Sequence, residues 1–112
     1  MIPPVQTLRL NKKEVDVLNS LKRRLKINQW NVLCRMAFCL SCQDESEPST
    51  FLENSSQGGV ELDWETFAGN SPEVYTALVA FHKLRSKSEL NSAEYFKRLI
   101  SRGIHRLRVE SI

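Results

Sequence analysis

The stretch from Thr7 to Lys26 places a strand pattern directly before a helix pattern. Residues 7–10 alternate polar and apolar side chains, which is typical of a short strand with one buried face. Asn11 follows at once and Glu14 lies three residues later, which is the spacing of a capping box at the start of a helix. Because a four-residue strand is not stable alone, we expect it to pair with a second copy of itself or with a later strand.

The helix after Asn11 is amphipathic, and its polar side carries cations. Its apolar arc consists of Val17, Leu18, Leu21 and Leu25. Residues 22–26 contain four cations and no acid; the cations are Lys22, Arg23, Arg24 and Lys26. Soluble helix faces usually mix both signs of charge to limit repulsion. A run of one sign therefore favours a polyanion-binding surface over the simpler interpretation of a solvated helix face.

A second helix is predicted from Gln29, capped by Asn28, to about Ser41. Its apolar residues follow the i, i+3, i+4, i+7 spacing of a buried stripe, and they are Leu33, Met36, Ala37 and Leu40. This prediction places two packed helices directly after the strand.

The second helix and its end hold all three cysteines of the chain, Cys34, Cys39 and Cys42. Their C-x4-C-x2-C spacing matches part of an iron–sulfur loop. A fourth thiolate is missing, however, and on a helix Cys39 is turned about 140° from Cys34. We therefore interpret the cysteines as small buried hydrophobic residues.

Charge divides the chain into three parts. Residues 1–35 carry eight Lys or Arg against two acids, residues 36–82 carry eight acids and no Lys or Arg, and residues 83–112 carry eight Lys or Arg against three acids. The net charge of +3 hides this distribution. Two basic ends around an acidic middle indicate a polyanion-binding surface, with the acidic segment held elsewhere on the molecule.

The acidic middle of the chain has the composition of a loop. Residues 43–58 are predicted to form a mobile, solvated loop. A short strand or turn is expected at residues 60–62, followed by one helical turn after Asp63. Trp64 and Phe67 should anchor this later part to the core.

The segment from Ser71 to Glu73 is a typical helix opening, with a capping serine, a proline at the first position and an acid in the first turn. The helix that it begins is apolar on nearly its whole circumference between Val74 and Leu84, so we expect it to be largely buried. A lone histidine in such a helix, His82, is interpreted as a packed core residue.

A last helix is expected from a cap at Ser92 to a closing glycine at Gly103, with Arg102 on its outer side. Residues 104–109 alternate polar and apolar side chains again. They predict an extended segment, which would be a plausible partner for the strand at residues 7–10.

Together these patterns predict a mainly α fold in a single domain of residues 1–112. It would consist of a strand-helix-helix unit at residues 7–42 that is similar to a ribbon-helix-helix unit, an acidic loop-rich insertion at residues 43–70, and C-terminal helices at residues 71–112. No secretory signal precedes the strand, and no apolar run reaches the roughly 20 residues needed to cross a bilayer. With an odd number of cysteines, this favours a cytoplasmic protein without membrane contact.

Motifs for catalysis or cofactor binding are absent from the sequence. It has no phosphate-binding glycine loop, no H-E-x-x-H and no G-x-S-x-G, so no catalytic, cofactor-binding or metal-binding residue is assigned and no enzyme is expected. Two other interpretations stay open. The acidic segment at residues 44–65 and the apolar helix at residues 74–84 would suit a protein-interaction scaffold. A nicking nuclease, or a sulfur carrier acting through Cys34, Cys39 or Cys42, would be an enzyme.

Three segments of the chain resemble the DndE family of the bacterial DNA phosphorothioation (Dnd) system. They read PPVQTLRLNKKEVDVLNSLKRRL near the N-terminus, SPEVYTALVAFHKL in the middle and AEYFKRLISRGIHRL near the end. The likeness covers essentially the whole chain. It implies a ribbon-helix-helix-like, mainly helical fold, assembly as a homotetramer, binding of nicked double-stranded DNA, and the other Dnd modification proteins as partners.

The position of the cations departs from the wider ribbon-helix-helix pattern. Sequence-reading members insert a paired ribbon into the major groove, which would put Thr7 and Arg9 on base edges. This chain concentrates its cations on the helix instead, where they neutralise phosphates without reading sequence. The residues that we expect to bind the DNA backbone are Arg9, Lys12, Lys13, Lys22, Arg23, Arg24 and Lys26, with Arg9 as a secondary contact.

Overall fold

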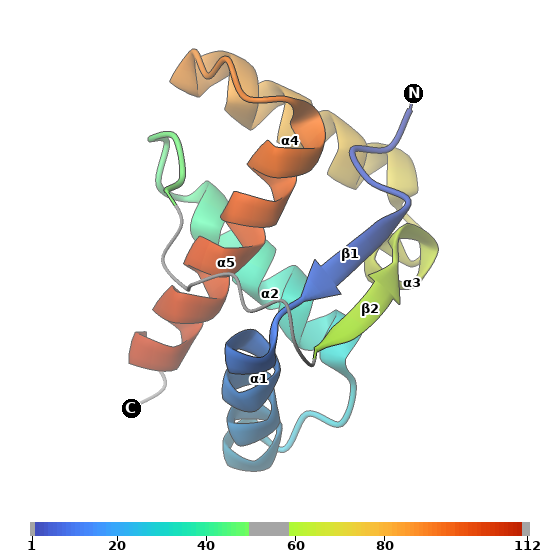
Figure 1. The fold of residues 1–112 in the computed structure, drawn as a ribbon, viewed down its shortest axis with the longest axis vertical. Helices are drawn as coiled ribbons and strands as arrows, with labels where there is room; N and C mark the ends of the chain where they lie inside the picture. Colours follow the sequence, from blue (N-terminus) through green and yellow to red (C-terminus); the bar gives the residue numbers. More distant parts are fainter. Residues whose placement is uncertain (1, 50–58, 111–112) are drawn as a thin grey trace.

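Two helices that cross in the middle of the molecule, α2 (Trp30–Cys42) and α5 (Ser92–Glu110), form the centre of the fold (Figure 1). The computed structural model describes residues 2–49 and 59–110. In chain order its elements are β1 (Thr7–Leu10), α1 (Lys12–Leu25), α2, β2 (Val60–Asp63), α3 (Trp64–Ala68), α4 (Pro72–Ser86) and α5. The predicted mainly α fold is confirmed, whereas residues 50–58 of the predicted loop lie outside the described residues.

The two strands form a small antiparallel sheet beside the helices (Figure 1). β1 pairs with β2 along its whole length, with Leu10 opposite Val60. Leu8 and Leu10 are buried, as the alternation predicts. The expected pairing of β1 with a later strand is confirmed, but the partner is β2 and not residues 104–109.

Residues 104–109 are the last turns of α5, so the extended segment predicted there is wrong. Ile104 and Leu107 continue a buried i, i+4, i+7 series that starts at Ile100. One face of a helix satisfies this spacing and a strand does not. Packing against the core thus overrides the local alternation of polar and apolar residues.

Gly103 lies inside α5 and does not close it, which corrects the predicted end of the helix. A Cβ atom at Gly103 would come within 1.9 Å of the carbonyl oxygen of Ala37 in α2. Only a residue without a side chain fits there. The glycine therefore permits the close crossing of α2 and α5.

α1 begins as the capping-box spacing predicts. The Asn11 side chain accepts a hydrogen bond from the backbone N–H of Glu14 at 2.8 Å, and the Glu14 carboxylate accepts one from the backbone N–H of Asn11 at 3.0 Å. The other oxygen of this buried carboxylate accepts the Ser101 hydroxyl at 2.7 Å, which ties the start of α1 to α5. α2 begins one residue later than predicted, because Gln29 has an extended backbone and is the N-cap in place of Asn28.

α4 contradicts the prediction of a largely buried helix. Its inner side buries Thr76, Val79 and His82, which confirms His82 as a packed residue. Its outer side exposes four large apolar side chains, Val74 by 56%, Leu78 by 39%, Phe81 by 57% and Leu84 by 75%. An apolar circumference predicts neighbours on all sides. α4 instead lies across one end of the molecule, and one of its sides packs against the other described elements (Figure 1).

α3 supplies the aromatic centre of the core, which confirms the predicted anchoring by Trp64 and Phe67. The Phe67 ring packs edge-on against Phe38 and Phe96, with centroids 5.8 and 5.1 Å apart. Trp64 meets Phe96 in the same way at 5.3 Å. In the part of the chain that the structure describes, no helix is long and apolar enough to span a membrane.

Candidate nucleic-acid interface

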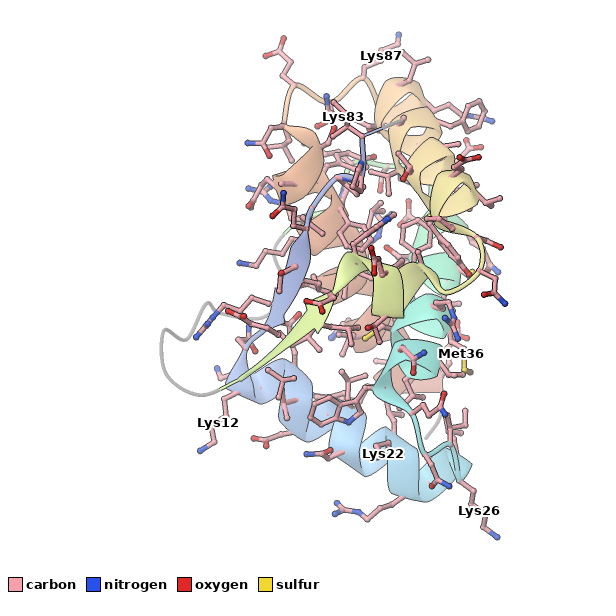
Figure 2. All side chains as sticks on the ribbon, turned by 90° about the vertical axis from the view of Figure 1, so that its right-hand side faces the viewer. Lys12, Lys22, Lys26, Met36, Lys83 and Lys87 are labelled. Atoms are coloured by element: carbon pink, nitrogen blue, oxygen red, sulfur yellow. The ribbon has the colours of Figure 1, made fainter. Side chains whose placement is uncertain are left out.

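α1 lies at the end of the molecule opposite α4 (Figure 1). Leu18 and Leu21 are buried, which turns the polar side of the helix outward. Lys12 at the start of α1 and Lys26 at its end extend from this end of the molecule in Figure 2, whereas Lys22 lies over the helix in this view. With 14 residues at about 1.5 Å each, α1 is about 21 Å long and can face several phosphates of a duplex.

The cations concentrate at the C-terminal end of α1. Lys22, Arg23 and Arg24 lie in its last turn, and Lys26 ends the helix with a left-handed φ of 56°. The negative end of the helix dipole is here, and a cation beside it contributes about 0.3–1 kcal/mol. One or two cations are enough to interact with the helix dipole. The cluster has four, so this end of α1 keeps an excess of positive charge.

Trp30 holds one of these cations, a role that the helical pattern of α2 does not reveal. The Lys22 ammonium lies 5.7 Å from the centroid of the Trp30 ring, which is within the range of a cation–π interaction. The indole N–H of Trp30 donates to the side-chain oxygen of Asn19 at 3.1 Å. The tight turn between α1 and α2 is the sequence signal for this contact, since it brings the first residue of α2 beside the end of α1.

The N-terminal end of α1 carries mixed charge. Lys12 and Lys13 are exposed, but the exposed Asp16 lies one turn after Lys12 on the same side of the helix. Lys13 at this end and Arg24 at the other also interact with neighbouring groups of the chain. A phosphate would therefore meet stronger positive charge at the C-terminal end of α1 than at its start.

Arg9 lies apart from the helix cations, on β1. It forms an ion pair with Glu61 of β2 at 3.3 Å, and both side chains are more than half exposed. The acid neutralises part of the charge that Arg9 could offer to DNA, so the structure brings the helix cations together without Arg9.

The acidic turn that follows α2 is fixed against α4 and α5. Arg102 is only 1% exposed, and its guanidinium donates to the carbonyl oxygens of Ser41, Asp44 and Ser46. His82 of α4 donates a ring N–H to the Asp44 carbonyl at 2.7 Å. The predicted position of Arg102 on the outer side of its helix is therefore wrong, because carbonyls at the end of α2 need donors that a helix terminus lacks.

The same turn holds a strongly stabilised carboxylate. Hydrogen bonds from the hydroxyl and N–H of Ser46, and from the Arg106 guanidinium at 2.5 Å, keep the pKa of Asp44 well below its usual range. The loop predicted as solvated from residue 43 is thus bound to the core over its first residues. Part of the negative charge is held at α4 and α5, away from α1.

The three cysteines occupy different surroundings. Cys34 is buried as interpreted, whereas Cys39 is exposed and corrects that interpretation. Burial raises the pKa of Cys34 to about 12, assisted by the Glu14 carboxylate, and burial likewise raises the pKa of Cys42 to about 12. Because the thiolate is the nucleophile, both thiols are poorly suited to accept sulfur near neutral pH. Within residues 2–49 and 59–110, no group of three His, Cys, Asp or Glu side chains is placed to hold a metal ion.

The fold and its charge define a small, mainly α protein whose strand-helix-helix unit presents a basic outer helix. A family model described as "DNA sulphur modification protein DndE" matches residues 7–111. The chain belongs to the DndE family and so to the DNA phosphorothioation system, which confirms the resemblance seen in the sequence.

Comparison with solved structures agrees with this assignment. The chain is similar to the crystal structure of a DndE mutant involved in DNA phosphorothioation, with a TM-score of 0.63 and 20% sequence identity. The match covers 94% of this chain and 98% of that chain, and at this identity it supports the fold alone. No curated protein matches the chain.

Proposed function

We propose that the protein is a DNA-binding subunit of the phosphorothioation machinery and that it contacts the phosphate backbone through α1. The observation that carries this proposal is the cluster of cations at the C-terminal end of α1, at the far end of the molecule from α4. Each lysine or arginine that neutralises a phosphate releases counterions, which gives affinity without sequence preference. The seven residues named from the sequence remain the proposed contacts, with Lys22, Arg23 and Lys26 as the main ones.

The sheet supports backbone contact over base reading. In ribbon-helix-helix proteins that read sequence, the paired strands lie in the major groove. Here β1 pairs with β2 of the same chain, and Arg9 is engaged by Glu61. The outer side of α1 is then the better surface for DNA.

We further propose that nicked double-stranded DNA is the preferred ligand of a cytoplasmic, non-catalytic homotetramer that works with the other Dnd modification proteins. Membership of the DndE family supports the last point. A nick makes the duplex easier to bend, and the energy of bending is part of binding. A homotetramer repeats the α1 surface, and a flexible joint lets two such surfaces engage one duplex.

The test is a pair of charge reversals measured by titration of a nicked duplex over several salt concentrations. Lys22→Glu with Arg23→Glu should weaken binding and lower the slope of log affinity against log salt by about 2, since each lost phosphate contact removes roughly 0.9. Lys97→Glu with Arg98→Glu makes the same change of net charge on α5, outside both α1 and α4, and should leave the slope near that of the unmodified protein. Equal losses in both variants, or none in the α1 variant, would contradict the proposal.

A protein-interaction scaffold is the second candidate, and the exposed apolar side of α4 favours it. The α1 variant that no longer binds DNA separates the two roles. If it still retains the modification proteins in a pull-down, the scaffold role exists beside DNA binding. If it loses them, DNA mediates the association and the scaffold role is excluded.

A further inference from the structure

The outer side of α4 carries a stripe of exposed apolar side chains. Its residues Val74, Leu78, Phe81 and Leu84 recur every three or four positions, so they share one side of the helix. A hollow of about 210 Å³ beside Leu78 and Phe81, also lined by Cys42 and His82, extends this surface towards α2. A helix that is apolar on two sides is normally covered on both. Among residues 2–49 and 59–110, those that contact α4 cover its inner side and leave the outer side exposed.

Charges at the two ends of the stripe indicate what covers the outer side. Glu73 lies in the first turn of α4, while Lys83 lies in the last turn and Lys87 at its C-cap. Arg85, also in the last turn, is paired with Glu45 at 2.6 Å. A second α4 in antiparallel orientation would bring its basic end beside Glu73 and its acidic end beside the lysines. Opposed helix dipoles add to this preference. A parallel arrangement would instead place like charges together.

Residue size in the middle of α4 suits the same arrangement. Ala77 is exposed near the midpoint of the helix, between the large side chains at either end, and Ala80 lies on the neighbouring flank towards Ser92. Small residues there let two helix backbones approach, and the hollow beside Leu78 and Phe81 can receive a large side chain of the facing helix. Both features repeat in each copy, as a contact about a two-fold axis requires.

We propose that α4 is a self-association surface, on which two copies of the chain pair α4 against α4 in antiparallel orientation about a two-fold axis. This inference rests on the homotetramer of the proposed function, and it adds one of the surfaces through which the copies would contact each other. A tetramer with dihedral symmetry needs more than one kind of two-fold contact, and α4 supplies one of them. Because α1 lies at the opposite end of the molecule, this pairing leaves the proposed DNA surface of each copy open (Figures 1 and 2).

The first experiment measures molecular mass by sedimentation over a concentration series. We expect Phe81→Glu with Leu84→Lys to shift the assembly towards half its mass, with unchanged thermal unfolding of the monomer, since both side chains are exposed. Val109→Lys removes an exposed apolar residue of α5 and serves as the matched control, with the mass of the unmodified protein.

The second experiment tests orientation by charge exchange. Glu73→Lys alone and Lys87→Glu alone should each weaken association by severalfold, and the double variant should restore it. An unmodified protein that stays monomeric throughout overturns both self-association and the role of α4. An assembly that persists in the Phe81 and Leu84 variant overturns only the role of α4, and failure of the double exchange overturns the antiparallel arrangement.

Discussion

Among the proposed DNA contacts, Lys22 is the one whose ammonium packs over an aromatic ring of the neighbouring helix. Its ammonium lies over the Trp30 ring, and that ring is oriented by its hydrogen bond to Asn19. A side chain that is already ordered loses less conformational entropy on binding. We therefore propose that Trp30 acts as a positioning residue for Lys22.

We expect Trp30→Leu to weaken DNA binding by about two- to fivefold, because a cation–π interaction at a partly exposed site contributes roughly 0.5–1 kcal/mol. Trp30→Phe keeps an aromatic face under Lys22 and should lose less. Titration of a nicked duplex measures both variants, and thermal unfolding of each separates binding from stability. Equal affinities of the Leu and Phe variants would show that the ring does not act on Lys22.

Sequence patterns predicted the start of α1, which depends on neighbouring residues, and failed at Gly103 and on the outer side of α4, which depend on distant ones. The capping box at Asn11 and Glu14 is local, and it was predicted correctly. Gly103 has the local signature of a helix end, yet the carbonyl of Ala37 explains it, and Ala37 is 66 positions away. The prediction that α4 is buried fails for a related reason. Periodicity shows which residues are apolar, but it does not show which element covers them.

The turn after α2 gives an element-scale prediction of pH dependence. The pKa of Asp44 is low in the folded protein because Ser46 and Arg106 donate hydrogen bonds to the carboxylate. A carboxyl with a lower pKa in the folded than in the unfolded state stabilises the fold above its unfolded pKa of about 4, and this stability is lost as the pH falls further. We expect Asp44→Asn to lower the midpoint of thermal unfolding at neutral pH.

The difference between Asp44→Asn and the unmodified protein should shrink as the pH falls from about 5 to about 2. Glu45→Gln is the matched control, because Glu45 is exposed and its ion pair with Arg85 lies at the surface, where ion pairs contribute little. A difference for Asp44→Asn that stays constant over this range would contradict the assigned role of the carboxylate.

At the scale of the whole molecule, the basic cluster and the exposed apolar surface occupy opposite ends. The basic cluster lies on α1, and the apolar stripe lies on α4 at the opposite end (Figure 2). The uneven charge of the sequence predicted a basic surface with the acidic segment held elsewhere, and the fixed turn at Asp44 shows how part of the acidic segment is held. The division of the chain at residues 7–42, 43–70 and 71–112 stays a prediction.

What the sequence could not provide at this scale was the set of contacts between distant residues. The burial of Arg102 depends on carbonyl groups about 60 positions earlier in the chain, and a lone arginine on a helix carries no signal of them. The cation cluster of α1 could be predicted from the sequence without knowledge of distant contacts, because its residues are close together in the chain.

The most direct test of backbone binding through α1 compares intact and nicked duplexes of identical sequence over a salt series. We expect both to bind with the same slope of log affinity against log salt, because the same cations meet phosphates in each, and the nicked duplex to bind more tightly at every salt concentration. Binding that does not change with salt would contradict phosphate contact, and equal affinities would contradict the preference for a nick.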